Sequence, residues 1–253
     1  MTTATRQKAA INLACLAGNP YPGRGVLIGH TESGHYMVQA TWLMGRSESS
    51  RNRVYNFDSD HRRVFTEPAD PAKMAGKDTS LLIYNAMMER HGVFIASNGH
   101  QTDEVLKAVT DSEATLGSAL HEFQYEPDAP NFTPRITAMY SLVKGDWAIQ
   151  FAILKRSLWS EECDRHIFRY KMIGAGYGLY VSTYVGNGDP LPSWEGEPIP
   201  IILYGSDDPT DIAENLWANL DLDNRVSLAV KLIEPIHGNS RTYIINEQGK
   251  CIA

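Results

Sequence analysis

Polar side chains able to hold an anion gather where a predicted strand meets a predicted helix. Residues 97–103 read Ser-Asn-Gly-His-Gln-Thr-Asp, and the Asn-Gly pair closes the strand. A helix start offers backbone N–H donors that no intrahelical acceptor takes, so it suits an anion. The candidate binding residues are Asn98, Gly99, Thr102 and Asp103. A tight turn with Thr102 or Asp103 capping the helix is an equally compatible interpretation.

Guanidinium groups are concentrated in a second segment, although the chain carries a formal net charge of -7. The sequence pairs Arg46 with Ser47 and Asn52 with Arg53. The planar fork of arginine matches phosphate oxygens, which favours a phosphate site. Residues 46–60 lack an apolar period and predict a long exposed loop. A solvated run of charge is the alternative, and the sequence leaves it open.

A third segment places four kinds of polar group before one predicted strand. Glu126 is followed by Asn131, Thr133 and Arg135, so that an acid, an amide, a hydroxyl and a guanidinium lie at one strand mouth. Such a set could orient a polar ligand and accept a proton from it. A capped loop is the alternative. Residues 182–184, Ser-Thr-Tyr, form a fourth polar patch that we interpret as a strand tip.

Other classes of chemistry are not indicated. There is no P-loop, no dinucleotide-binding glycine pattern, no zinc-protease motif and no nucleophile elbow. The eight histidines and three cysteines lack metal-ligand spacing, so we expect no metal and no disulfide framework. The acidic balance argues against nucleic acid, and no apolar run is long enough to span a membrane. We expect a protein of the reducing cytoplasm.

The elements that must position these groups are mostly strands. The apolar and turn patterns predict an N-terminal docking helix over residues 9–17 and a second helix over residues 102–123, broken near Gly117. A third helix is predicted over residues 208–219. Strands are predicted at residues 25–30, 35–44, 63–66, 81–88, 92–97, 134–143, 147–154, 166–173, 178–185, 226–233 and 242–246. Many antiparallel strands with few helices indicate one α+β layered domain over residues 1–253.

In their order along the chain, these pieces resemble the archaeal-type IMP cyclohydrolase family. The resemblance rests on Tyr21-Pro22-Gly23-Arg24, Arg46-Ser47, Asn52-Arg53, Tyr84-Asn85, Ser97-Asn98-Gly99, Thr102-Asp103, Tyr125-Glu126, Asn131, Thr133-Pro134-Arg135 and Ser182-Thr183-Tyr184. It spans roughly residues 21–246 and is densest over residues 84–138. Residues 1–20 form an extension that the family pattern lacks.

The resemblance implies a fold, an assembly and a reaction. The fold would be a four-layer αββα sandwich of antiparallel sheets, like that of N-terminal-nucleophile hydrolases, in a homo-oligomer. The reaction would close the ring of 5-formamidoimidazole-4-carboxamide ribonucleotide to IMP with loss of water, without a cofactor. Its partner would be this small purine ribonucleotide precursor, with neither nucleic acid nor membrane involved.

The resemblance also suggests roles for matched residues. Glu126 would accept a proton, and Tyr55 or Tyr84 would donate one. Arg24, Arg46 and Arg53 would hold the phosphate and the developing charge, with neutral donors from Asn98, Gly99 and Thr102. The remaining substrate-binding candidates are Asn52, Asn85, Asp103, Asn131, Thr133 and Arg135.

Two alternatives remain from other functional classes. An amidohydrolase of the same architecture would need a Cys, Ser or Thr exposed as the first residue after processing, and the nearest candidates are Thr2 and Cys15. A noncatalytic purine-nucleotide-binding protein would keep the arginines without turnover.

Overall fold

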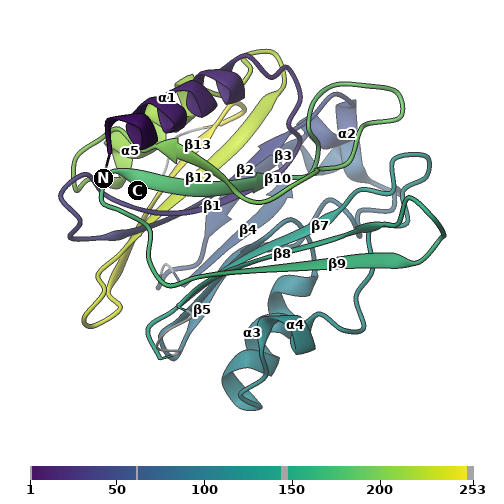
Figure 1. The fold of residues 1–253 in the computed structure, drawn as a ribbon. Helices are drawn as coiled ribbons and strands as arrows, with labels where there is room; N and C mark the ends of the chain where they lie inside the picture. The colour runs from purple at the N-terminus through teal and green to yellow at the C-terminus, as the bar shows by residue number, and fades with distance from the viewer. Residues whose placement is uncertain (1, 61, 144–147, 250–253) are drawn as a thin grey trace.

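Two antiparallel sheets dominate the computed structural model, which describes residues 2–60, 62–143 and 148–249 (Figure 1). The first sheet has the strand order β11-β10-β1-β2-β12-β13. Its strands are β1 (Gly25–His30), β2 (Met37–Met44), β10 (Tyr177–Ser182), β11 (Ile199–Ile202), β12 (Arg225–Ile233) and β13 (Ser240–Asn246). The prediction of an α+β protein with antiparallel sheets is confirmed.

In the second sheet the strands lie side by side in the order in which they occur along the chain, β3-β4-β5-β6-β7-β8-β9. Its strands are β3 (Arg53–Phe57), β4 (Arg63–Pro68), β5 (Asn85–Arg90), β6 (Val93–Ser97), β7 (Arg135–Ser141), β8 (Ile149–Arg156) and β9 (Cys163–Tyr170). Antiparallel neighbours can be joined by short turns, as most of these strands are, although residues 69–84 separate β4 from β5 and residues 98–134 separate β6 from β7.

The helices cover the outer faces of the two sheets. Helix α1 (Thr3–Ala17) contacts β11, and α5 (Pro209–Ala218) contacts β12 and β13. On the other side, α3 (Gln101–Asp111) contacts β5 and β6, and α4 (Leu116–Ala119) contacts β8. The sheets face each other through contacts of β1 with β7 and β2 with β6, so helix, sheet, sheet and helix follow in layers (Figure 1).

The central strands are buried along their whole length, including polar residues such as Gln39 and Arg135. Every residue of β2 and of β7 is buried, because one face of each strand meets the opposite sheet and the other meets a covering layer. The larger apolar cluster fills the space between the sheets and extends under α1 and α5. A smaller one lies between α3, α4 and the second sheet. Both faces of each sheet are therefore largely kept from water, whereas the edge strand β9 is partly exposed.

The predicted exposed loop at residues 46–60 is wrong. The segment contains the short helix α2 (Glu48–Arg51) and the strand β3, which pairs with β4. Ser47 and Ser50 form a capping box around α2, and Arg53 and Tyr55 are buried. The strand was not predicted because strands are recognised in a sequence by alternating apolar side chains, whereas β3 buries the side chains of Arg53 and Tyr55.

Other boundaries also differ from the predictions. The helix predicted over residues 102–123 ends at Asp111 and resumes briefly as α4, so the break precedes Gly117. Glu113, inside the break, has a positive φ of 52°, which a helix does not accommodate. The strands predicted at 81–88 and 166–173 are β5 and β9, and both are shifted. Strand β11 and the 3-10 helix η1 (Pro71–Met74) were not predicted.

The N-terminal segment forms the predicted helix, although α1 begins at Thr3 rather than Ala9. Ala9, Leu13 and Leu16 are buried at spacings of four and three residues, so one side of the helix docks on the first sheet. None of the helices described combines the length and apolar character that crossing a bilayer requires. His61, Trp147 and Cys251, which entered the metal, strand and disulfide predictions, lie outside the described residues.

Candidate active site

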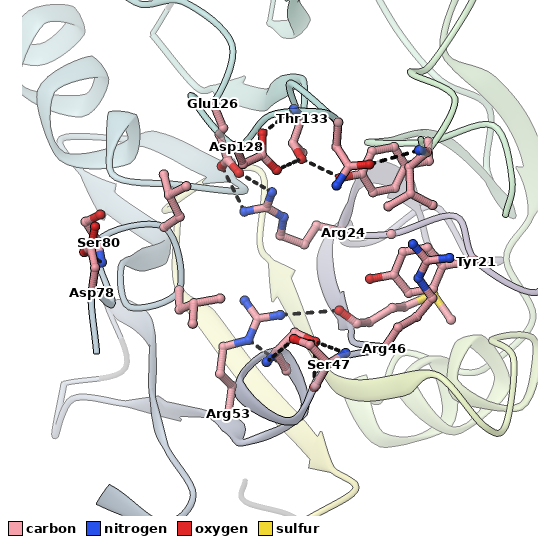
Figure 2. Close-up of a pocket in the computed structure, with 18 residues that line it drawn as sticks. Tyr21, Arg24, Arg46, Ser47, Arg53, Asp78, Ser80, Glu126, Asp128 and Thr133 are labelled. Atoms are coloured by element: carbon pink, nitrogen blue, oxygen red, sulfur yellow. Dashed lines mark hydrogen bonds and ion pairs between the residues drawn. The ribbon is translucent and has the colours of Figure 1, made fainter. Parts of the chain in front are cut away.

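A polar pocket of about 410 Å³ opens where five chain segments meet at one end of the two sheets. We call it the arginine pocket, because Arg24, Arg46 and Arg53 line it. Figure 2 shows Arg24 and Arg53 reaching toward the same space from different sides. Of the predicted site residues, Glu126, Asn131 and Thr133 also line this pocket. Three segments that the sequence singled out therefore converge in space.

A buried ion pair between Arg24 and Glu126 forms one wall. Arg24 donates from Nη1 to Oε1 at 2.9 Å and from Nη2 to Oε2 at 2.6 Å, so the contact is bidentate (Figure 2). The side chains are only 12% and 2% exposed. Burial by itself would lower the pKa of Arg24, but the Glu126 carboxylate outweighs it and raises the pKa well above its usual value. The Arg24 guanidinium is therefore charged.

Arg135 lies behind this pair and does not line the pocket. Its Nη1 is 3.7 Å from Glu126 Oε1 and donates to Gln101 Oε1 at 3.1 Å. Burial lowers the pKa of Arg135, and the Glu126 carboxylate opposes that effect. Glu126 thus faces two guanidiniums. A Cβ added at Gly99 would lie 2.6 Å from Arg135 Nη1, so the glycine is needed for this close approach.

The Asn98-Gly99 turn contacts the wall formed by Arg24 and Glu126, and neither of its residues lines the pocket. The Asn98 carbonyl accepts from Arg24 Nη1 at 2.8 Å, while its side chain binds the Pro134 carbonyl and the Ile136 N–H. Thr102 donates to the Gly99 carbonyl at 2.9 Å. Helix α3 starts without a side-chain cap at His100, so the predicted cap at Thr102 or Asp103 is wrong.

Three predicted binding residues, Asn52, Asn85 and Asp103, lie away from the pocket. Asn85 donates to Asp103 at 2.6 Å in an exposed contact, and neither residue lines the pocket. Asn52 is buried and exchanges hydrogen bonds with the backbone of Asp70, both at 2.8 Å. It fixes the segment that follows α2 and has no contact with the pocket space.

Arg53 is a buried guanidinium without a counter-ion among the described residues. Its Nε donates to the Ser50 carbonyl at 2.9 Å and its Nη2 to the Met44 carbonyl at 3.3 Å. Its Nη1 has no hydrogen-bond partner in the described part of the chain. Burial lowers the pKa of Arg53, with Arg24 adding to the effect. A buried cation in this state favours an anionic ligand.

Arg46 lies at the pocket rim and is held by two different kinds of contact. Its guanidinium carbon is 4.7 Å from the centre of the Tyr21 ring, and Nη1 donates to Asn187 Oδ1 at 2.5 Å. Cation–π and amide contacts orient the group without neutralising its charge. Arg46 therefore keeps its charge available to a ligand.

The two predicted proton donors are buried near the arginines but do not line the pocket. The Tyr55 hydroxyl contacts Thr41 Oγ1 at 3.2 Å, and burial raises its pKa well above the usual value. Burial also raises the pKa of Tyr84, while the nearby Arg24 guanidinium lowers it in part. The Tyr84 hydroxyl makes no hydrogen bond of good geometry with any described residue.

A hydrogen-bonded cluster that the sequence did not predict occupies another wall. The Thr133 hydroxyl contacts both Asp128 Oδ2 and the Tyr184 hydroxyl, and Thr133 N–H donates to Asp128 Oδ1 at 2.7 Å. Tyr21 stacks on Tyr184 with ring centres 6.0 Å apart. The polar patch at residues 182–184 was a usable signal for Tyr184. Asp128 was overlooked beside Glu126.

Fold and pocket together define a class: an α+β protein of two facing antiparallel sheets, with a pocket in which Arg46 and Arg53 have no carboxylate partner among the described residues and so suit a small anionic ligand. Among the described residues, no three His, Cys, Asp or Glu side chains gather in a way that could hold a metal ion. The chain belongs to the family described as IMP cyclohydrolase-like protein, whose sequence profile matches residues 21–238. Comparison with curated proteins gives no match.

The family assignment confirms the resemblance seen in the sequence and suggests a purine nucleotide as the substrate class. The match begins at Tyr21, so the whole of α1 lies outside it, as the predicted extension does. Thr2, which caps α1, and Cys15, which lies on it, do not line the arginine pocket.

Proposed function

We propose that this protein is an IMP cyclohydrolase, which closes 5-formamidoimidazole-4-carboxamide ribonucleotide to IMP with loss of water. The observation that carries the proposal is the pair of guanidiniums in the arginine pocket, Arg46 and Arg53, that have no carboxylate partner among the described residues. The third guanidinium that lines the pocket, that of Arg24, is paired with Glu126. Arg46 and Arg53 offer charge to a phosphate, and membership of the family suggests a purine nucleotide as the substrate.

The size of the pocket supports a nucleotide ligand. Small-molecule sites usually have about 300 to 1,000 Å³, and a volume of about 410 Å³ lies within that range. Tyr21 and Leu191 supply apolar surface beside the charged groups. We propose that Arg46 and Arg53 hold the 5′-phosphate and that Asn131 orients the imidazole.

The reaction needs positioning more than a strong catalyst, because both reacting groups belong to one molecule. The carboxamide nitrogen attacks the formyl carbon of the neighbouring formamide, and a well-oriented intramolecular attack gains a large effective molarity. Negative charge develops on the formyl oxygen. Fixed donors aimed at that oxygen stabilise the transition state.

Arg24 is our candidate for the fixed donor. The bidentate contact with Glu126 and the bond to the Asn98 carbonyl hold its guanidinium in one orientation. Tyr84, one of the proton-donor candidates from the sequence, is buried beside Arg24 and does not line the pocket, so we propose that it supports the guanidinium. Both oxygens of Glu126 are bound by Arg24, so we now assign Glu126 to orienting the guanidinium rather than to accepting a proton.

The remaining expectations from the resemblance accompany this proposal. We propose that the layered sheets are of the N-terminal-nucleophile-hydrolase type, that residues 1–253 act as one domain, and that the active form is a homo-oligomer in the cytoplasm. An amidohydrolase activity is not favoured, because neither Thr2 nor Cys15 reaches the pocket. Nothing in the pocket favours a noncatalytic role.

The direct test is to incubate the purified protein with the formylated ribonucleotide and follow the purine absorbance of IMP. The matched control is the same formylated nucleoside without its phosphate. We expect turnover of the ribonucleotide and a much weaker reaction of the nucleoside. Absence of turnover with tight IMP binding would support the noncatalytic alternative, and equal reaction of both compounds would refute the phosphate role of the arginines.

A further inference from the structure

Three carboxylates line the arginine pocket. Asp78 is exposed and accepts from the Ser80 N–H at 2.9 Å, whereas Glu126 and Asp128 are less exposed and lie in very different surroundings. Both oxygens of Glu126 accept from the Arg24 guanidinium, and Arg135 adds a second guanidinium at 3.7 Å. Asp128 makes no ion pair with an arginine or lysine among the described residues, and its oxygens accept instead from Thr133. A carboxylate held by guanidiniums is a poor proton acceptor, whereas one held by a hydroxyl can exchange a proton with it.

The contacts of Asp128 continue as a chain of hydroxyls along the pocket wall. The Thr133 hydroxyl donates to Asp128 Oδ2 and also contacts the Tyr184 hydroxyl, and all three residues line the pocket. For Thr133 to donate to Asp128, Tyr184 must be the donor in the second contact. The hydrogen bonds then run in one direction, from Tyr184 through Thr133 to Asp128.

Resting on the cyclohydrolase function proposed above, we propose that Tyr184, Thr133 and Asp128 form the proton relay of ring closure, with Asp128 as its terminal acceptor. Tyr184 is the member that contacts the substrate. Thr133 and Asp128 act through it. Glu126, the acid that the sequence favoured for this role, is left to hold Arg24.

The relay balances both steps of the reaction. In the first, the carboxamide nitrogen forms a bond to the formyl carbon, and one of its protons passes through both hydroxyls to Asp128. That proton returns along the relay to the former formyl oxygen. In the second, the formamide nitrogen gives its proton to the relay while the carbon–oxygen bond breaks, and the departing hydroxide takes that proton from the relay and leaves as water. Asp128 ends as a carboxylate.

The state of Tyr184 agrees with a relay rather than a free base. Burial raises its pKa to about 12, with the Arg24 guanidinium acting in the opposite direction. The phenol is therefore neutral near pH 7, and it can pass a proton only by receiving one and giving up another together. The stacking of Tyr21 on its ring, with centres 6.0 Å apart, fixes the hydroxyl relative to Thr133.

The test compares kcat and KM for ring closure in Asp128→Asn, Tyr184→Phe, Thr133→Val and Thr133→Ser. Asn, Phe and Val each interrupt proton transfer, so we expect kcat to fall by about 100-fold or more, the scale of general acid–base catalysis. KM and the Kd for IMP should change little. Thr133→Ser keeps the hydroxyl and should retain most of the activity. Asp164→Asn, on strand β9 away from the pocket, is the matched control.

Each outcome decides between the relay and the function on which it rests. If the wild-type protein does not cyclise the ribonucleotide, the cyclohydrolase function is wrong and the relay with it. If the wild type is active and Asp128→Asn keeps its kcat, or loses only affinity, the relay alone is overturned. Thermal unfolding of each variant identifies any that do not fold. The Thr133→Val and Thr133→Ser pair then decides, because equal loss in both contradicts a role for the hydroxyl.

Discussion

Removing the carboxylate of Glu126 should lower the stability of the folded protein as well as its activity. The Glu126→Gln variant leaves Arg24 buried, with the Asn98 carbonyl as its remaining firm acceptor, and leaves Arg135 without the carboxylate 3.7 Å away. Breaking one partner of a buried ion pair costs about 3 to 5 kcal/mol, because a buried charge remains uncompensated. Glutamine offers a single neutral acceptor in place of two charged ones.

The magnitude can be measured by urea and thermal unfolding without ligand. For a chain of this length, each kcal/mol shifts Tm by about 2 to 4 °C, so we expect a loss of about 6 to 20 °C. Arg24→Met should cost less, because Glu126 keeps Arg135 as a neighbour. The double variant removes both members of the pair. Its loss should therefore be smaller than the sum of the single losses by at least about 1 kcal/mol.

An exposed pair provides the control for this double-mutant cycle. Arg90 Nη2 lies 2.9 Å from Asp111 Oδ1, yet both side chains are substantially exposed. Water screens such a pair, so its coupling should stay below about 1 kcal/mol. The reasoning is refuted if the Arg24 and Glu126 losses add, or if their coupling does not exceed that of the exposed pair.

Three further predictions concern binding, packing and pH. Arg53→Lys should weaken IMP binding about tenfold or more, because an ammonium cannot keep the two backbone contacts and still reach a phosphate. Gly25→Ala should lower the free energy of unfolding by about 3 kcal/mol, since its Cβ would lie 1.9 Å from the buried Trp42 ring. Burial raises the pKa of Tyr180 and of Tyr184 to about 12, above the usual value near 10. The folded protein then holds protons that the unfolded chain releases, so stability should fall as pH rises from about 10 to 12, and less steeply in Tyr180→Phe.

Each of these has a control and an opposing result. Arg90→Lys, at an exposed site, should leave the Kd for IMP unchanged by calorimetry, and an equal loss there would contradict a specific role for Arg53. Gly117→Ala, in α4 with its nearest neighbour 3.6 Å from the added Cβ, should be neutral or slightly stabilising in urea unfolding. If the free energy of unfolding does not change between pH 10 and 12, the two tyrosines ionise at the same pH in the folded protein as in the unfolded chain, which contradicts the prediction.

The predictions from sequence were accurate where the buried side chains of an element are apolar. Strands β1 and β12 and the helix α5 were located within a few residues, because their apolar residues recur with the period of the element. Strand β3 was missed because its core-facing residues include Arg53 and Tyr55, which look like surface residues in a pattern. Site residues were recognised by type and neighbourhood, so Asp128, which follows the more conspicuous Glu126, was overlooked.

By itself the sequence determined the class of fold, the family and the segments that carry polar chemistry, because periodicity, turns and short motifs are local properties of the chain. Only the tertiary structure decided which partners meet. Arg24 and Glu126 are 102 residues apart in the chain, and Thr133 and Tyr184 are 51 apart. Whether a carboxylate meets a guanidinium or a hydroxyl depends on how the two sheets bring distant loops together. That contact, through burial and neighbouring charge, determines whether the acid orients an arginine or accepts a proton.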